Sequence, residues 1–321
     1  MRRPKILSIA TTTAMILLLL WPLAGCAGRE GGDVGQQGRQ SDDGGGKSET
    51  SHDAEGKIAF ENLRQRDGDI YTIKADGTDP VRLTDHPAME GDPTWAHGTE
   101  KIAFVVSDRH GNNDIYAMNA DGTGEVNLTD DNPDFVWFPE WSADGRRIAY
   151  AGTHHGDFEI YAMNANGEDS VRITDHPGDD GAPTWSPDAQ KLAYMSDQNG
   201  NYEICTVNAD GTSLVNITNH PKGDQHPAWA PDGGKIAFVS NRQGDWDIYT
   251  MNTDGTGIER LANLPGDEWF PTWSPDGRKI AFTGSRGIDE DIYTMNADGT
   301  GVERLTDLPG MVGSPTWQAA D

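Results

Sequence analysis

Apolar and polar positions recur along this chain with a long and nearly constant period. From residue 57 onward, the apolar run Lys-Ile-Ala-Phe or a close variant occurs six times. Its copies begin at Lys57, Lys101, Arg147, Lys191, Lys235 and Lys279, at spacings of 44, 46, 44, 44 and 44 residues. Self-similarity at a fixed period of this size is the signature of a repeat architecture.

Each repeat contains four short runs of the kind that form β-strands. The Ile-Ala-Phe run is followed by an acidic residue with Ile, by Arg-Leu-Thr or a variant, and by Pro-x-Trp. The acids are Asp69, Asp114, Glu159, Glu203, Asp247 and Asp291, and the tryptophans are Trp95, Trp141, Trp185, Trp229, Trp273 and Trp317. Turn sequences such as Ser-Pro-Asp-Gly and Asn-Ala-Asp-Gly-Thr-Gly separate the runs, and Asp-Gly between β-rich runs is a strong hairpin signal.

The strands are not cleanly amphipathic, because Ile280, Ala281 and Phe282 are consecutive and apolar. Strands of this kind are covered on both faces. Four-stranded sheets of about 44 residues, each stacked between two others, are the blades of a β-propeller. We therefore predict an all-β fold with six four-stranded blades over residues 57–321.

The two ends of the repeat region complement each other. The region begins at the second strand of a blade, at Lys57, and ends with a first strand over residues 314–317. Pairing this last strand with residues 58–60 would complete the first blade and remove the exposed edges of an open array. We expect the C-terminal strand to close the ring in this way.

The repeats resemble a known family. Pro-Thr-Trp-Ser-Pro-Asp-Gly-Arg-Lys-Ile-Ala-Phe at 271–282, Asp-Ile-Tyr-Thr-Met-Asn-Ala-Asp-Gly-Thr-Gly at 291–301 and Glu-Arg-Leu-Thr at 303–306 are similar to the WD-repeat-like blades of the TolB family. That resemblance implies a propeller that binds proteins in the cell envelope, as in the Tol-Pal system. Similar blades also occur in propellers attached to prolyl-oligopeptidase-type peptidases and in oligogalacturonate lyases.

The N-terminal residues read as an export signal. A basic start and a long apolar segment end in Leu-Ala-Gly-Cys at 23–26, so we expect residues 1–25 to be a signal peptide. Leu-Ala-Gly-Cys resembles the bacterial lipobox, in which the cysteine is lipidated. Residues 26–56 are then the lipidated Cys26 and a Gly-rich disordered tether, because this segment has almost no apolar side chain to bury. The protein would be extracytoplasmic, in the periplasm or at the cell surface, and would touch the membrane only through its lipid.

Composition narrows the classes of partner. The net charge of -27 opposes binding to nucleic-acid phosphates or to anionic lipid head groups. The chain has two cysteines, so lipidation of Cys26 leaves no intramolecular disulfide. Cys205 occupies a position that is Tyr in the other repeats, and we expect it to be a buried strand residue.

Motifs for catalysis are missing from the sequence. It contains neither the Gly-x-Ser-x-Gly of a nucleophile elbow nor the His-Glu-x-x-His of a zinc peptidase. His86, His176 and His220 fall at equivalent points of three repeats, which favours a turn role. The Ala-Asp-Gly-Thr sequences also favour structural turns, with calcium binding as the alternative. We expect no catalytic residue, no bound metal and no cofactor.

Departures from the repeat point to a binding site. The two residues before Pro-x-Trp vary among the copies, and two copies carry Trp-Phe. These are Trp137-Phe138 and Trp269-Phe270, which lead into blades three and six, on opposite sides of a six-bladed ring. We predict that they form two facing aromatic walls at one channel mouth and grip a peptide or a sugar. His226 and Asp92 occupy the same pre-proline position in other repeats.

Acidic residues beside this predicted mouth favour a basic ligand. Asp134, Asp267 and Glu268 are close to the two Trp-Phe pairs in sequence, and negative charge suits a basic peptide better than an acidic oligosaccharide. The hypothesis is a monomeric, non-enzymatic scaffold that binds a protein or peptide partner in the envelope. The alternative is a carbohydrate-active, lyase-type propeller enzyme with a metal near His226.

Overall fold

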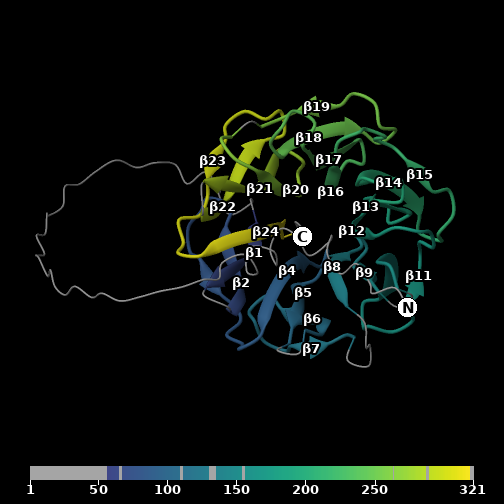
Figure 1. Ribbon diagram of the computed structural model, residues 1–321. Helices are drawn as coiled ribbons and strands as arrows, with labels where there is room; N and C mark the ends of the chain where they lie inside the picture. Colours follow the sequence, from purple (N-terminus) through teal and green to yellow (C-terminus); the bar gives the residue numbers. More distant parts are fainter. Residues whose placement is uncertain are drawn as a thin grey trace, which may run out of the picture. The chain divides into compact units, whose positions relative to one another are not determined.

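The computed structural model describes residues 56–64, 67–108, 111–129, 135–153, 156–262, 264–286 and 289–318. They form six four-stranded antiparallel sheets, arranged around a common axis (Figure 1). Across these ranges the chain has no α-helix, and so none of the long apolar helices that cross a bilayer. The prediction of an all-β, six-bladed propeller with four-stranded blades is confirmed.

We number the blades from the one that contains the first strand, and give the strands of each blade from the axis outward. Blade 1 consists of β24 (Met311–Trp317), β1 (Lys57–Arg64), β2 (Asp67–Lys74) and β3 (Val81–Arg82). Blade 2 consists of β4 (Met89–Trp95), β5 (Lys101–Ser107), β6 (Asn113–Asn119) and β7 (Val126–Asn127). Blade 3 consists of β8 (Val136–Trp141), β9 (Arg147–Gly152), β10 (Glu159–Asn164) and β11 (Val171–Arg172).

The other three blades follow the same order. Blade 4 consists of β12 (Asp180–Trp185), β13 (Lys191–Ser196), β14 (Glu203–Asn208) and β15 (Val215–Asn216). Blade 5 consists of β16 (Asp224–Trp229), β17 (Lys235–Ser240), β18 (Asp247–Asn252) and β19 (Glu259–Arg260). Blade 6 consists of β20 (Glu268–Trp273), β21 (Lys279–Arg286), β22 (Asp289–Asn296) and β23 (Glu303–Arg304).

The C-terminal strand closes the ring as predicted. β24 pairs antiparallel with β1, with Ile58 opposite Trp317 and Ala59 opposite Thr316. Trp317 is 6% exposed and packs with Ile58 in a cluster that also includes Ile292 of blade 6. The final strand therefore supplies an inner strand to blade 1 and a hydrophobic contact to blade 6.

The middle strands of each blade are buried on both faces. In β21, Ile280, Ala281 and Phe282 are fully buried, which confirms the prediction from their consecutive apolar character. Phe282 stacks on Tyr293 of the neighbouring strand, with ring centroids 5.7 Å apart. Cys205 is fully buried in β14, also as predicted, and burial raises the pKa of its thiol to about 12.

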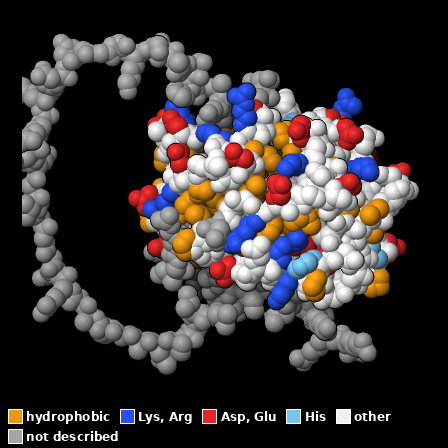
Figure 2. Space-filling model, turned by 90° about the horizontal axis from the view of Figure 1, so that it is seen from above, with side chains coloured by type: hydrophobic (Ala, Val, Ile, Leu, Met, Phe, Trp, Pro, Cys, Tyr) orange, Lys and Arg blue, Asp and Glu red, His pale blue; other side chains and the backbone are white. Residues whose placement is uncertain are grey.

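The outermost strands of the blades are short, and some expose an apolar residue while others expose an acidic one. Each outermost strand is only two residues long, which leaves little edge for pairing with another chain. In blades 1 to 4 this strand exposes a valine, and in blades 5 and 6 the equivalent residue is Glu259 or Glu303. Figure 2, seen at right angles to Figure 1, shows acidic and basic side chains intermixed over this surface, with hydrophobic ones between them.

The acid that precedes Ile in the third strand of each blade has a structural role. In blade 3, Thr174 Oγ1 accepts the Ile160 N–H at 2.9 Å and donates to Glu159 at 2.7 Å. The same Thr–acid bond occurs in blades 2, 4 and 6. Blade 5 has Ala262 in place of the threonine, and Glu268 of the next blade accepts the Ile248 N–H at 3.1 Å instead.

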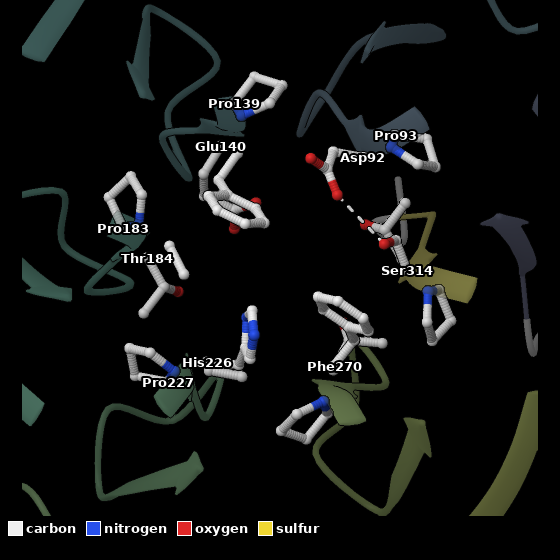
Figure 3. Close-up of a pocket in the computed structure, with 17 residues that line it drawn as sticks. Asp92, Pro93, Pro139, Glu140, Pro183, Thr184, His226, Pro227, Phe270 and Ser314 are labelled. Atoms are coloured by element: carbon white, nitrogen blue, oxygen red, sulfur yellow. Dashed lines mark hydrogen bonds between the residues drawn. The ribbon is translucent and has the colours of Figure 1, made fainter. Parts of the chain in front are cut away.

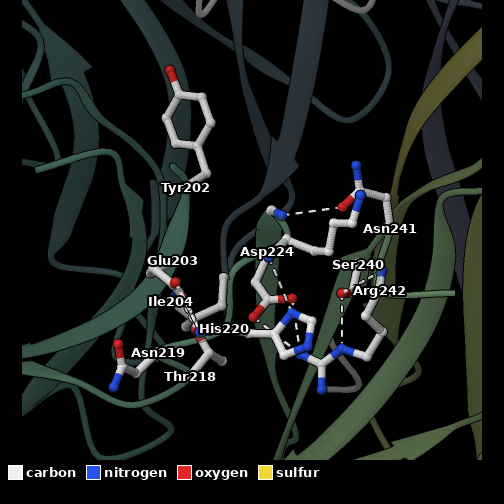
Figure 4. A network of polar contacts seen from close by, with 12 residues as sticks. Tyr202, Glu203, Ile204, Thr218, Asn219, His220, Asp224, Ser240, Asn241 and Arg242 are labelled. Carbon is white, nitrogen blue, oxygen red and sulfur yellow. Dashed lines mark hydrogen bonds and ion pairs between the residues drawn. The ribbon is translucent and has the colours of Figure 1, made fainter. Parts of the chain in front are cut away.

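Figure 4 shows this type of network where blades 4 and 5 meet. Glu203 accepts from the Thr218 hydroxyl and from the His220 N–H at 2.6 and 2.8 Å. Nearby, Arg242 donates to both oxygens of fully buried Asp224 at 2.9 and 3.0 Å. Polar groups buried between these blades are thus satisfied by specific partners, which fixes how the blades dock.

The Asn-Ala-Asp-Gly-Thr turns bring neighbouring blades into backbone contact. In blade 5, Asp254 Oδ1 accepts from the Thr256 N–H and hydroxyl, which identifies a structural Asx-type turn. Gly255 follows with φ of 83°, and a Cβ there would lie 2.0 Å from the Ile217 carbonyl oxygen of blade 4. Gly77 of blade 1 meets Leu305 of blade 6 in the same way, at 2.9 Å.

A buried carboxyl group lies where the ring closes. Glu61 of β1 is 3% exposed, and its Oε2 accepts the Asp92 N–H of blade 2 at 3.0 Å. The Ser314 hydroxyl oxygen of β24 lies 3.4 Å from the other oxygen. Burial, and next the nearby Asp92 charge, raise the pKa of Glu61 to about 8. The closing strand pair therefore holds a carboxylic acid that is largely protonated at neutral pH.

The contact between turn and neighbouring blade predicts unequal effects for two glycine substitutions. Gly98 has φ of 67° but open space around its Cβ position, so Gly98→Ala should cost only the left-handed backbone strain, about 1–2 kcal/mol. Gly255→Ala has the same strain and must also displace the Ile217 carbonyl, which should add about 1–3 kcal/mol. Chemical denaturation of both variants would measure the difference, and equal losses would contradict the close approach.

Protonation of Glu61 predicts an unusual pH dependence of stability. Because its pKa is raised in the folded state, the folded protein holds a proton that the unfolded chain releases, so the free energy of unfolding should fall as pH rises from about 4.5 to 8. Glu61 should contribute a slope of up to about 1.4 kcal/mol per pH unit. Glu61→Gln should remove this part and melt higher than the unaltered protein at pH 8. Glu100→Gln, at an exposed position, should leave the profile unchanged.

Candidate functional site

A bulge in every inner strand directs one side chain toward the axis. The register of each innermost strand with its neighbour shifts at the residues before and at the proline. The residue before each proline has a left-handed φ between 45° and 53°. These six residues, here called the axial ring, are Asp92, Phe138, Ala182, His226, Phe270 and Ser314. Bulges commonly re-aim a side chain next to a functional site, and proline suits a position outside the hydrogen-bond ladder.

The axial ring and its prolines surround a cavity of about 130 Å³. Figure 3 shows Asp92, His226, Phe270 and Ser314 projecting into it from different blades. Five further residues complete the lining: Glu140, Thr184, Ala228, Thr272 and Thr316. None of these described lining residues is Lys or Arg.

One side of the cavity is aromatic. His226 lies between two phenylalanines, with ring centroids 4.4 Å from Phe270 and 5.7 Å from Phe138. His226 is 8% exposed, and burial lowers the pKa of its imidazole to about 3. The ring is therefore neutral at physiological pH, and within the described part of the chain neither of its nitrogens has a hydrogen-bond partner.

The other side of the cavity is acidic. Asp92 Oδ1 accepts from the Ser314 hydroxyl at 3.1 Å, and Glu140 Oε2 accepts from the Thr94 hydroxyl at 3.0 Å. Burial raises the pKa of Asp92 to about 6 and that of Glu140 to about 7. Both carboxyl groups thus exchange protons near physiological pH, and each keeps acceptor capacity beyond its present bond.

The predicted site residues divide into two groups. Phe138, Phe270, His226 and Asp92 all line the cavity. Their tryptophan neighbours do not: Trp269 is 6% exposed and packs on Trp246 at 4.8 Å.

Trp137 lies beside the cavity in a similar way. Its indole N–H reaches the side-chain amide of Asn113, 3.0 Å away, and its ring lies 6.4 Å from that of Phe138. The expected pair of Trp-Phe walls is therefore replaced by one continuous cluster, in which His226 joins the two phenylalanines. Only the second residue of each pair has the left-handed backbone that directs it to the axis.

The acids expected at the mouth also differ from the prediction. Asp267 accepts the Trp246 N–H at 3.0 Å, and Glu268 is fully buried and accepts two backbone N–H groups. Both stabilise neighbouring loops or strands and neither lines the cavity. Asp134 lies outside the described residues. The negative charge at the axis comes instead from Asp92 and Glu140.

Two acidic residues near the axis were missed by sequence reasoning, although both break the repeat. Glu140 is the middle residue of Pro-x-Trp, which is Thr or Ala in the other five copies. Glu61 follows the Ile-Ala-Phe run, where the other copies have Val105, Ala151, Met195, Val239 and Thr283. Comparing every column of the repeat, and not only the two before proline, would have identified them.

The histidines of the Asp-His-Pro and Asn-His-Pro turns lie away from the cavity lining. His220 Nδ1 accepts the Lys222 N–H at 3.1 Å, as expected for a turn residue. His176 Nε2 lies 3.1 Å from Asp180, which raises the pKa of the imidazole. In the described residues no three His, Cys, Asp or Glu side chains are grouped so that they could hold a metal ion.

Comparisons with known proteins agree on the fold. Residues 120–267 match the family model of the TolB beta propeller domain. No curated protein sequence matches the chain significantly. Among solved structures, TolB from Acinetobacter baumannii superposes with a TM-score of 0.72 at 21% identity, over 83% of this chain and 67% of that one.

Two further structures extend the comparison. A protein designated TolB from Agrobacterium tumefaciens gives a TM-score of 0.66 at 22% identity, over 81% of this chain and 91% of that one. Oligogalacturonate lyase from Vibrio parahaemolyticus gives 0.55 at 16% identity, over 78% and 74%. At these identities the similarity establishes architecture alone. The chain therefore has the six-bladed β-propeller fold, and its residues 120–267 are similar to the TolB beta propeller domain.

Proposed function

We propose that this protein is a lipid-anchored, extracytoplasmic propeller that serves as a protein-binding scaffold in the cell envelope. The similarity of its blades to TolB supports a protein-binding role. The Leu-Ala-Gly-Cys sequence at 23–26 supports export and lipidation at Cys26. The strong negative charge supports a partner with basic character.

The observation that carries the proposal is the contrast between the blades and the axial ring. The Ile-Ala-Phe strands are nearly identical in all six blades, because each must pack between two neighbours. The axial ring instead has six equivalent backbone positions occupied by an acid, two phenylalanines, a histidine, an alanine and a serine. Packing alone needs no such variety, whereas recognition of a ligand with different sides does.

The lyase-type alternative places a metal near His226. His226 is packed against Phe138, Trp269 and Phe270, and the only further support is the weaker likeness to oligogalacturonate lyase. Elemental analysis of the purified protein distinguishes the two functions. A stoichiometric transition metal that is lost on mutation of His226 would favour the enzyme.

Anchoring predicts a specific effect of removing one cysteine. Cys26→Ser should abolish incorporation of labelled fatty acid and move the protein from the membrane fraction to the soluble fraction, because a single acyl-bearing residue holds it there. Cys205→Ala, at the buried cysteine of β14, should leave labelling and fractionation unchanged. If Cys26→Ser still sedimented with membranes after a high-salt wash, the anchor would lie elsewhere.

The scaffold proposal predicts that the axial phenylalanines are needed for partner capture. The double variant Phe138→Ala, Phe270→Ala should keep its melting temperature within a few degrees, because Ala182 already occupies the same left-handed position in blade 4. It should fail to capture the partner that the unaltered protein retains from solubilised envelopes. Phe135→Ala, which is 44% exposed and does not line the cavity, is the matched control. Equal capture by the double variant and the control would place the binding surface elsewhere.

A further inference from the structure

We infer that the axial cavity binds an alkylammonium group, with the lysine side chain of a protein partner as its source. The choice of a lysine as the source rests on the proposed scaffold function, whereas the ammonium site itself depends only on the cavity. Three features define it: a small volume, two carboxyl groups on adjacent blades, and an aromatic side that contains an unpartnered histidine.

The volume of the cavity limits the size of the ligand that it can hold. The cavity has a volume of about 130 Å³. Pockets for drug-sized molecules are larger, about 300–1,000 Å³. The cavity is thus too small for an oligosaccharide and suits the end of one extended side chain. A lysine delivers a compact cation on an unbranched alkyl stem.

The acidic side supplies the charge complementarity. Asp92 on β4 and Glu140 on β8 each line the cavity. Asp92 accepts from the Ser314 hydroxyl and the Phe138 backbone N–H, and Glu140 accepts from the Thr94 hydroxyl. A carboxylate has about four acceptor positions, so both retain capacity for an ammonium N–H. No described cation lines the cavity to compete for them. Hydrogen bonds between ions of opposite charge are among the stronger ones in proteins.

The aromatic side supplies contacts for both parts of the ligand. The faces of Phe138 and Phe270 can receive the alkyl stem or attract the cation itself. His226, more than nine-tenths buried, lies between them and points into the cavity (Figure 3). Its neutral ring offers one acceptor nitrogen that no described residue uses. An ammonium N–H could donate to that nitrogen.

Protonation gives the binding a definite pH dependence. The titratable groups around Asp92 are Glu61 on β1, with Glu290 of β22 behind it, and the neutral His226 across the cavity. Glu140 faces the Thr94 hydroxyl. A bound cation favours the ionised carboxylates, so binding should release protons and strengthen as pH rises through the raised pKa values of Asp92, about 6, and Glu140, about 7.

The test is titration calorimetry of the purified full-length chain with n-butylammonium, and with n-butanol as the neutral probe of equal size. We expect saturable binding of n-butylammonium only, with an affinity that is higher at about pH 8 than at about pH 6. The double variant Asp92→Asn, Glu140→Gln should bind at least about tenfold more weakly, the loss expected when a hydrogen bond to a charged group is removed.

The variants are chosen to preserve the fold. Asn readily adopts the left-handed backbone of Asp92, and Gln can keep the bond from Thr94. Glu100→Gln, at an exposed carboxyl outside the cavity, should bind like the unaltered protein. Equal binding of n-butanol, unchanged affinity in the double variant, or an affinity that does not rise with pH would each overturn the inference.

Partner capture separates this inference from the scaffold proposal. If a partner is captured through the axial phenylalanines but n-butylammonium neither binds nor displaces it, the scaffold stands and the ammonium site is overturned. If n-butylammonium binds with the expected variant pattern and no partner is captured, the site is supported with a free amine as its source, and the scaffold proposal fails.

Discussion

Closure of the ring by β24 and β1 is the constraint on which the rest of the structure depends. Blades stack in a propeller because each is apolar on both faces, so an unclosed array would leave two such faces in water. The pairing of Ile58 with Trp317 joins residues from opposite ends of the propeller and covers both faces. It also fixes six inner strands around one axis, and only then do side chains from different blades meet in a common cavity.

The bulge before each proline directs side chains of the closed ring into one common site. A regular inner strand would alternate its side chains between the two neighbouring blades. The left-handed residue interrupts that alternation and directs one side chain per blade toward the axis. Non-glycine residues in this conformation cost about 1–3 kcal/mol each in typical proteins. The fold sustains six of them because proline and the strand pairing on either side restrict the backbone.

The fold could be predicted from the sequence because the repeat expresses it six times. The Ile-Ala-Phe run predicted strands that are covered on both faces. The repeat region begins with a second strand at Lys57 and ends with a first strand, which predicted closure. The site was predicted only in part. Phe138 and His226 were placed at the axis, but Trp137 was placed there too, because strand periodicity does not reveal which residue of a bulge takes the left-handed conformation. Backbone geometry, and not residue type, decides that Phe138 lines the cavity and Trp137 packs against Asn113.

Glu61 and Glu140 show that the chemistry near the axis depends on residues in which single repeats differ from the others. Glu61 is buried and Glu140 is half-buried. Both have raised pKa values, and both occupy positions where other blades use small or apolar residues. Such residues oppose stability, since burial of a carboxyl group without a cation favours its neutral form. With Asp92 they lie in blades 1 to 3, whereas His226 and Phe270 lie in blades 5 and 6. Phe138 of blade 3 contacts His226 and completes the aromatic cluster.

The cavity is therefore chemically asymmetric. An acid-bearing side and an aromatic side face each other across the same axis, in a ring whose packing requires neither. Natural sequences break their own local rules mainly where function requires it. The polar groups that weaken this ring are concentrated at the one place where a ligand could contact several blades at once, so the axial cavity, and not the outer edge, is where the propeller's binding chemistry should be sought.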